Sequence, residues 1–192
     1  MATRRRDPLL GESQRARLGA GEGARVDAPR GGPAITAPGI ALGLGLGGLA
    51  DGIVLHQVLQ WHHLRTGDGS LGDRSMKTVG GLEANTLADG LFHVATWVLL
   101  VVGLLWLWGI VRSSGGLRSW GELVGLVLAG WGIFNVVEGV VNHHLLGMHH
   151  VRDDIGAPIT WDIGFLAVGG TLAVAGFALS GLGRNARFRP HG

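Results

Sequence analysis

The side chains of this chain best suited to chemistry are its histidines, and eight of the nine lie between positions 56 and 150. The chain has no cysteine, which excludes disulfides, thiolate metal sites and cysteine nucleophiles. Any metal would therefore be held by imidazole nitrogens and carboxylate oxygens, a ligand set that suits iron, copper(II) or zinc.

These histidines recur in a pattern that also contains an acid. The segment DGIVLHQVLQWHHLR, starting at Asp51, aligns without a gap with EGVVNHHLLGMHHVR, starting at Glu138. The offset is 87 residues, and seven of the fifteen positions are identical. A weaker match sets Asp89 and Phe92 over Asp162 and Phe165, with Leu166 at the place of His93. The sequence thus indicates a duplicated hairpin of two helices.

Four long apolar runs position these segments, at about residues 38–61, 88–111, 120–146 and 161–182. Each is long enough to cross a bilayer, which takes roughly 20 apolar residues. Gly39, Gly43 and Gly47 have the small-xxx-small spacing of packed membrane helices. We therefore expect an all-α integral membrane protein, a four-transmembrane-helix bundle. Its repeats, 38–111 and 120–183, would be related by a pseudo-two-fold axis along the membrane normal.

The positive charges predict the orientation of this domain. The tails and the 112–118 loop carry 12 lysines and arginines, whereas the 62–87 and 147–160 loops carry 4. Cytoplasmic segments are enriched in these residues, so both termini should be cytoplasmic. Residues 1–37 are expected to form a disordered basic tail, and residues 184–192 a second cytoplasmic tail. The two long loops, with the histidines, then face outward.

Lining up the spans at 1.5 Å per residue places the polar residues in layers. Asp51 and Glu138 lie nearest the midplane, with His56 and His143 about 7.5 Å further outward and the His-His pairs at the interface. On an unbroken helix His56 and His63 would be roughly 10 Å apart, too far for one ion. Either two ions bind at different depths, or the helix ends near residue 61 and the His-His pair folds back.

The candidate metal ligands are the residues that combine a suitable donor with a place in these layers: His56, His143, His93, Glu138, Asp51, His62, His63, His149 and His150. Four further residues could orient them: Asp89, Asn135, Asn142 and Asp162. The simpler interpretation of Asp89 and Asp162 is that each caps the N-terminus of its helix. The His-His pairs could be merely solvated, His144 is unrepeated, and no catalytic residue can be assigned.

Four strings carry a family resemblance: DGIVLHQVLQWHH, DGLFHVATWVL, NVVEGVVNHHLLGMHHVRDD and WDIGFLAVG. Together they resemble a bacterial family of predicted membrane proteins, domain of unknown function 2243. The resemblance covers about residues 38–183 and implies a small multi-span protein of the bacterial inner membrane. It supplies no activity.

Function must therefore be argued from the residues. The leading hypothesis is a membrane protein that binds transition metal ions in the outer half of the bundle, as a redox metalloenzyme in its most specific form; haem is a less favoured variant. The alternatives are a non-enzymatic copper-handling or respiratory-complex assembly factor, and a proton or ion translocator. The expected partners are the lipid bilayer and the metal ion. No nucleic-acid module is visible, and a membrane-protein partner or homo-oligomer stays open.

Overall fold

The computed structural model describes residues 34–66, 77–117 and 119–185. The predicted basic tail lies outside these residues except for its last four positions, and residues 186–192 of the second tail lie outside as well. The described residues form helices and loops without a strand. All of them belong to one unit, residues 33–192.

The helices follow the apolar runs. Helix α2 (Thr36–Asp51) continues into a π-helix, η1 (Gly52–Val58), and α4 (Trp120–Glu138) continues into a second π-helix, η3 (Gly139–Leu145). Helix α3 spans Val79–Ser114, a short 3₁₀ turn η4 spans Asp153–Ile155, and α5 spans Ile159–Asn185. Four of these stretches are long and apolar enough to cross a membrane: Thr36–Val58, Val79–Ser114, Trp120–Leu145 and Ile159–Gly181.

Helix α3 begins earlier than the apolar run suggested, at residue 79 instead of about 88. The reason is a cap: the Thr78 hydroxyl accepts a hydrogen bond from the Gly81 amide at 3.1 Å, so the helix can start in a polar stretch. Asp89 therefore lies three turns inside the helix. The interpretation of Asp89 as an N-cap is wrong.

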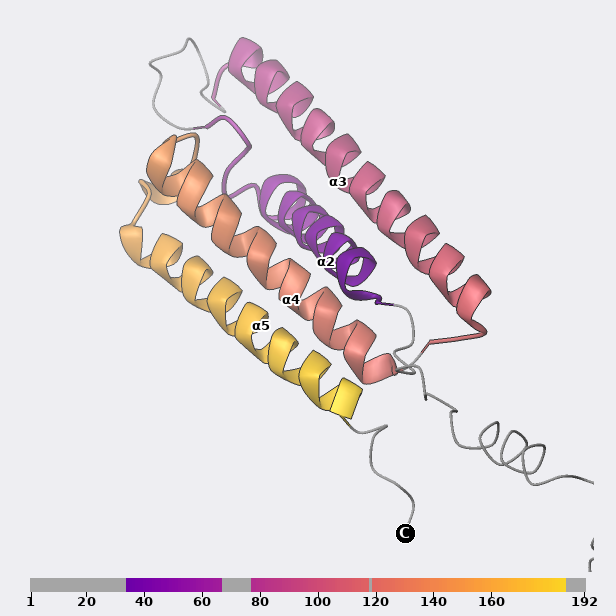
Figure 1. The fold of residues 1–192 in the computed structure, drawn as a ribbon. Coiled ribbons are helices and arrows are strands. Elements are labelled where there is room, and N and C mark those ends of the chain that lie inside the picture. Colours follow the sequence, from indigo (N-terminus) through magenta and orange to yellow (C-terminus); the bar gives the residue numbers. More distant parts are fainter. Residues whose placement is uncertain (1–33, 67–76, 118, 186–192) are drawn as a thin grey trace, which may run out of the picture. The chain divides into compact units, whose positions relative to one another are not determined.

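The helices pack in a row, α3–α2–α4–α5, as Figure 1 shows. Helix α2 contacts α3 and α4, and α4 contacts α5, while no contact joins α3 to α5 within the described residues. The inner helices α2 and α4 are each 44% buried over their apolar windows, against 17% for α3 and α5. The bundle we expected is therefore open, and the two outer helices present most of their surface to the surroundings.

Glycines set the distance between the two inner helices. A Cβ on Gly43 would lie 2.1 Å from the backbone oxygen of Val127, and one on Gly130 would lie 2.3 Å from that of Ile40. The two helices thus touch backbone to backbone, which only glycine permits. Gly39 and Gly47 also face α4, as the small-xxx-small spacing predicted.

The buried residues differ in chemistry between the two ends of the inner helices. Near the start of α2 the buried residues form an apolar cluster that includes Ile35, Leu42 and Leu126. At the opposite end of α2, where η1 and η3 lie, the buried residues are histidines and carboxylates. This polar end is where a site must be sought, because buried ionisable groups in a membrane protein are costly and usually functional.

Candidate metal centre

Each π-helix begins directly after an acid, and this geometry brings the acid and a histidine together. In an α-helix, residues five apart point about 140° away from each other. A π-helix bonds residue i to i+5, so such a pair shares one face. The Nε2 atom of His56 accordingly lies 3.3 Å from a carboxylate oxygen of Asp51, and that of His143 lies 3.2 Å from one of Glu138.

The chain then turns back on itself at the end of each π-helix. Gln60 has a positive φ of 50°, and Gly147, which aligns with it, has a φ of 54°. Backbone bonds close both turns, from the Trp61 amide to the Leu55 carbonyl at 3.0 Å and from the Met148 amide to the Asn142 carbonyl at 2.9 Å. Of the two arrangements left open above, the folded-back His-His pair is therefore the one found.

Folding back brings four imidazole rings into contact. The ring centroids of His56 and His62 are 4.6 Å apart, those of His62 and His149 are 4.5 Å apart, and those of His143 and His149 are 4.9 Å apart. All four residues are at most 2% exposed. Two of these rings come from each half of the chain, so the cluster lies where the halves meet.

Two of the four histidines are held by main-chain carbonyls of the opposite half. The Nδ1 atom of His62 lies 3.0 Å from the carbonyl oxygen of Val151, and that of His149 lies 3.1 Å from the carbonyl oxygen of Leu64. A carbonyl can only accept, so in both rings Nδ1 must carry the proton. In neutral His62 the lone pair is then on Nε2, one of the two ring nitrogens that can bind a metal.

The other two histidines lie beside carboxylates of α3 and α5. His56 Nδ1 donates a hydrogen bond to Asp89 at 2.9 Å, whereas His143 Nδ1 lies 3.3 Å from Asp162 without a hydrogen bond to it. Both acids are fully buried. A hydrogen-bonded histidine–carboxylate pair fixes the ring and increases its basicity as a ligand.

The Nε2 atoms on the far side of these rings have no ordinary partner. Those of His56, His62 and His143 are buried without a hydrogen-bond partner among the described residues, as are His143 Nδ1, one oxygen of Glu138 and, outside the cluster of four rings, His93 Nε2. The Nε2 of His149 faces the other Glu138 oxygen at 2.7 Å. Burying unpaired polar atoms is unfavourable, and a cation could satisfy those that converge.

The electrostatic surroundings keep His62 in its neutral form. Burial lowers the pKa of His62 well below its usual range, and the neighbouring His149 and His56 lower this pKa further. A metal-binding imidazole must be unprotonated at the ligating nitrogen, and His62 meets this condition.

Ligand atoms converge in two overlapping groups. One contains His56, His62 and His149, and the other contains Glu138, His143 and His149; within each group one donor atom per residue lies within 4.8 Å of the others. Every member is buried. Five of the nine predicted ligands are thus in these groups, and Asp51 adjoins the first through its contact with His56.

Asp89 also ties the folded-back segment to α3. It accepts hydrogen bonds from His63 Nδ1 at 2.5 Å, from the Leu64 amide at 2.8 Å and from Gln57 Nε2 at 3.2 Å. His63, a predicted ligand, is therefore bound to this carboxylate and lies outside both ligand groups.

Asp162 has the same role in the second half. It accepts from His150 Nδ1 at 2.6 Å and from the Val151 amide at 2.9 Å. Although Asp162 is in the first turn of α5, these partners belong to the preceding loop. His150, like His63, is bound to an acid outside both ligand groups.

The remaining predicted residues lie outside the two groups. The ring of His93 packs against Gly52, where a Cβ would be 2.5 Å from its Nε2, and Leu166 packs in the same way against Gly139. Asn135 is buried. Asn142 lies in η3, half-buried, and His144 is exposed there.

Sequence reasoning missed several residues that position the site. The side-chain oxygen of Asn85, a fully buried residue, accepts a hydrogen bond from the Arg65 amide at 3.2 Å and so holds the folded-back segment. Its signal was its spacing, one turn before Asp89 on the same face of the helix. The Arg152 guanidinium lies over the rings of Trp61 at 4.4 Å and Trp161 at 5.1 Å, linking the two halves above the cluster. The two carbonyls that hold His62 and His149 left no signal, because every residue has a carbonyl.

Comparison with known proteins places the chain in a family. No curated protein and no solved structure matches it. A family model described as "Predicted membrane protein (DUF2243)" matches residues 38–182, which confirms the resemblance of the four strings. The chain therefore belongs to this family of predicted membrane proteins.

Proposed function

We propose that this protein holds a resident transition-metal centre in the outer half of the membrane. The ligands are the Nε2 atoms of His56, His62, His143 and His149 and the carboxylates of Asp51 and Glu138. One observation carries the proposal: four buried imidazoles converge with their Nε2 atoms inward, while a carboxylate or a carbonyl holds the Nδ1 side of three of them, His56, His62 and His149.

The distances between acid and histidine fit ligands of a common ion. Two ligands bound to one tetrahedral ion at 2.0–2.1 Å lie about 3.3 Å apart. The Asp51–His56 and Glu138–His143 contacts are 3.3 and 3.2 Å. Charge-assisted hydrogen bonds are shorter, about 2.7–2.9 Å. The two contacts are thus better explained as edges of a coordination shell than as ion pairs.

Two adjacent ions account for the ligands better than one. His149 belongs to both ligand groups, but an imidazole offers a single Nε2 lone pair. We place it in the second group because it belongs to the same half of the chain as Glu138 and His143, although its 2.7 Å contact with Glu138 has the length of a hydrogen bond. One ion is then bound by Asp51, His56 and His62, and the other by Glu138, His143 and His149.

The same pairing supports a duplicated hairpin with a pseudo-two-fold axis along the membrane normal. Three features occur twice, 87 residues apart: the π-helix, the left-handed turn that follows it, and the hydrogen bond from an imidazole to a main-chain carbonyl of the other half. Gly43 and Gly130, also 87 apart, touch each other, as residues beside such an axis must. The repeats we propose are residues 38–111 and 120–183.

The location proposed is the bacterial inner membrane, with both termini cytoplasmic and the metal centre near the outer face. Burial favours a metal that stays bound over one that the protein delivers to a partner, because none of the six proposed ligand residues is more than 7% exposed. A protein that delivers copper needs an accessible site. Iron, copper(II) and zinc all suit the nitrogen and oxygen donors, and redox catalysis is the activity proposed if the metal is iron or copper.

The test is the metal content of the purified protein. Wild-type protein in mild detergent should contain about two ions per chain by elemental mass spectrometry. The His56→Ala/His143→Ala variant should lose both, whereas the matched control His93→Leu/His144→Ala should keep both, because neither residue joins a ligand group. Folding of each variant is checked by circular dichroism and thermal melting.

The alternative that the geometry supports is a proton network. The 2.7 Å contact between His149 and Glu138 has the length of a hydrogen bond and would suit a shared proton. Wild-type protein without metal, even after reconstitution with iron, copper and zinc, would refute the metal centre and leave this network.

A further inference from the structure

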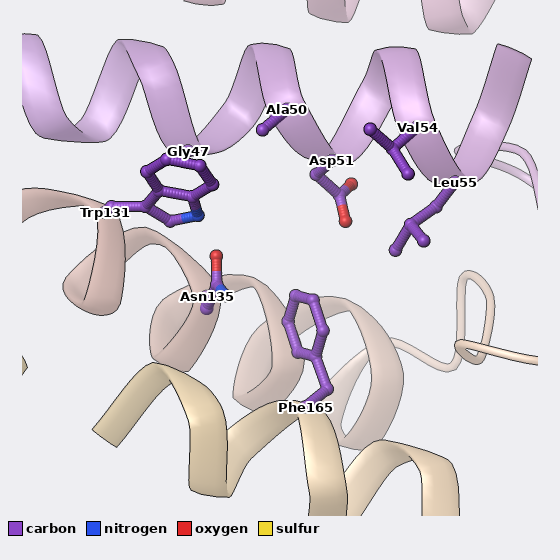
Figure 2. A pocket seen from close by; sticks show the side chains of 8 residues that line it. All are labelled: Gly47, Ala50, Asp51, Val54, Leu55, Trp131, Asn135 and Phe165. Atoms are coloured by element: carbon purple, nitrogen blue, oxygen red, sulfur yellow. The ribbon is translucent and has the colours of Figure 1, made fainter. Parts of the chain in front are cut away.

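A cavity of about 260 Å³, widely open to the surroundings, lies between α2–η1 on one side and α4 and α5 on the other. Figure 2 shows that Asp51 from the end of α2 and Asn135 from α4 both extend toward this space. The rest of the lining is apolar and includes Val54, Leu55, Trp131 and Phe165. The cavity therefore combines two polar groups with an otherwise hydrophobic wall, the composition of a small-molecule site.

The aligned position in the other half is filled. Gly47 lines the cavity and aligns with Phe134, whose ring packs 6.1 Å from that of Phe92 and against Gly48. Asn135 aligns with Gly48, which has no polar group to offer. The halves thus share their histidines but differ here, and the open space with its polar pair is a feature of the Asp51 side.

The depth of the cavity indicates how a ligand reaches it. Asp51 lies seven residues before the end of the first span, Val58, or about 10 Å inside it. At the rim Val54 is 45% exposed on a surface that the membrane would cover. A molecule entering here comes from the lipid phase, so it must be lipid-soluble.

The polar pair indicates which group the ligand carries. The Asp51 carboxylate accepts hydrogen bonds only, while the Asn135 amide can both donate and accept. A hydroxyl satisfies both, since it donates to one and accepts from the other. The indole of Trp131 and the ring of Phe165 favour a flat aromatic body.

We propose that this cavity binds a lipid-soluble aromatic hydroxyl compound, of the phenol or quinol class, with its hydroxyl on Asp51 and Asn135. Asp51 contacts His56 Nε2 at 3.3 Å, so the bound hydroxyl would lie beside the metal centre. The interpretation of the cavity as a substrate site rests on the function proposed above. Binding of the hydroxyl compound does not depend on that function, and it can be measured without metal.

The test uses photolabelling of the full-length protein in lipid nanodiscs. The probe is a phenol carrying a trifluoromethyl diazirine, and excess 4-ethylphenol serves as competitor. Competed labelling, mapped by peptide mass spectrometry, should fall on residues 47–55 and 131–135. The methyl ether of 4-ethylphenol, which cannot donate a hydrogen bond, should compete about tenfold less well than 4-ethylphenol itself. Equal competition by the ether would overturn the hydroxyl assignment.

Two variants test the place. Ala50→Phe fills the cavity and should abolish competed labelling. Val137→Phe adds a phenylalanine at the aligned position, which is 54% exposed, and should label within about twofold of wild type, as expected for a surface change. Competed labelling that persists in a folded Ala50→Phe variant, or that is absent in wild type, would overturn the proposal.

Metal content is measured on the same samples, which separates the two proposals. Bound metal without competed labelling removes only the ligand site. Competed labelling without metal leaves the ligand site standing and removes the metal centre.

Discussion

Replacing Asp89 by asparagine would test whether the carboxylates of the outer helices hold the metal ligands in place. Asp89 is fully buried and accepts from two imidazoles, from the amide of Leu64 and from the amide of Gln57. Asparagine has the same shape, but one of its two acceptor oxygens becomes an NH₂ group that faces donors. At least one imidazole would then lose its partner, and His56 would no longer be fixed.

The expected effect follows from this loss. Removing the partner that orients a metal-bound histidine weakens metal affinity by about 10- to 100-fold, or about 1.4 to 2.7 kcal/mol. Only the ion that we propose is bound by His56 and His62 should be affected, because the second half has its own acid, Asp162. Titration with the metal found in the wild type should therefore show one site weakened and one unchanged.

Affinity is measured by competition with a chromogenic chelator on detergent-solubilised protein, after a thermal melt confirms folding. Glu83→Gln provides the control, since it makes the same chemical change at an exposed position of α3. If a folded Asp89→Asn variant bound both ions within about twofold of the control, the carboxylate would not be orienting a ligand, and the reasoning from hydrogen bonds to metal geometry would be wrong.

Two further predictions concern packing and orientation. Gly43→Ala should destabilise the protein by about 1–3 kcal/mol, seen as a lower melting temperature, because a Cβ there would meet the backbone of α4. Gly109→Ala is the control, since nothing lies within 4 Å of that position, and it should be neutral or stabilising. Equal melting temperatures of the two variants would contradict a close contact between α2 and α4. The protein has no cysteine, so single cysteines can report sidedness: a membrane-impermeant maleimide should label Asp154→Cys in intact cells and Ser113→Cys only after permeabilisation, and the reverse pattern would refute an outward-facing metal centre.

Much of the fold could be predicted from the sequence, because it depends on local composition. An apolar run of bilayer length favours a helix wherever it is, so four such helices were expected, and four helices long and apolar enough to cross a membrane are found among the described residues. Glycines every four residues predicted a close contact on one face of α2, and that face does meet α4. The start of α3 was missed, because a threonine cap at residue 78 extends the helix into a polar stretch.

The candidate site was predictable in its members and not in its geometry. Histidines and acids at aligned positions marked the participants. Which of the candidate ligands face the cluster could not be predicted, because an imidazole that binds a carboxylate at 2.5 Å, as His63 does, has the same sequence signal as one facing the cluster. His93 illustrates the same point: it packs against Gly52, and at the aligned position in the second half an apolar residue, Leu166, packs against Gly139 in the same way.

The sequence by itself determined which residue types recur, how far apart they are, and that they lie at one end of long apolar helices, because these properties depend on the order of residues alone. The tertiary structure decided the rest. A π-helix in place of an α-helix turns His56 toward Asp51, a left-handed residue reverses the chain at position 60, and carbonyls of Leu64 and Val151 select the tautomers of histidines in the opposite half. The carbonyl contacts join segments nearly 90 residues apart, and a local pattern carries no information about such contacts.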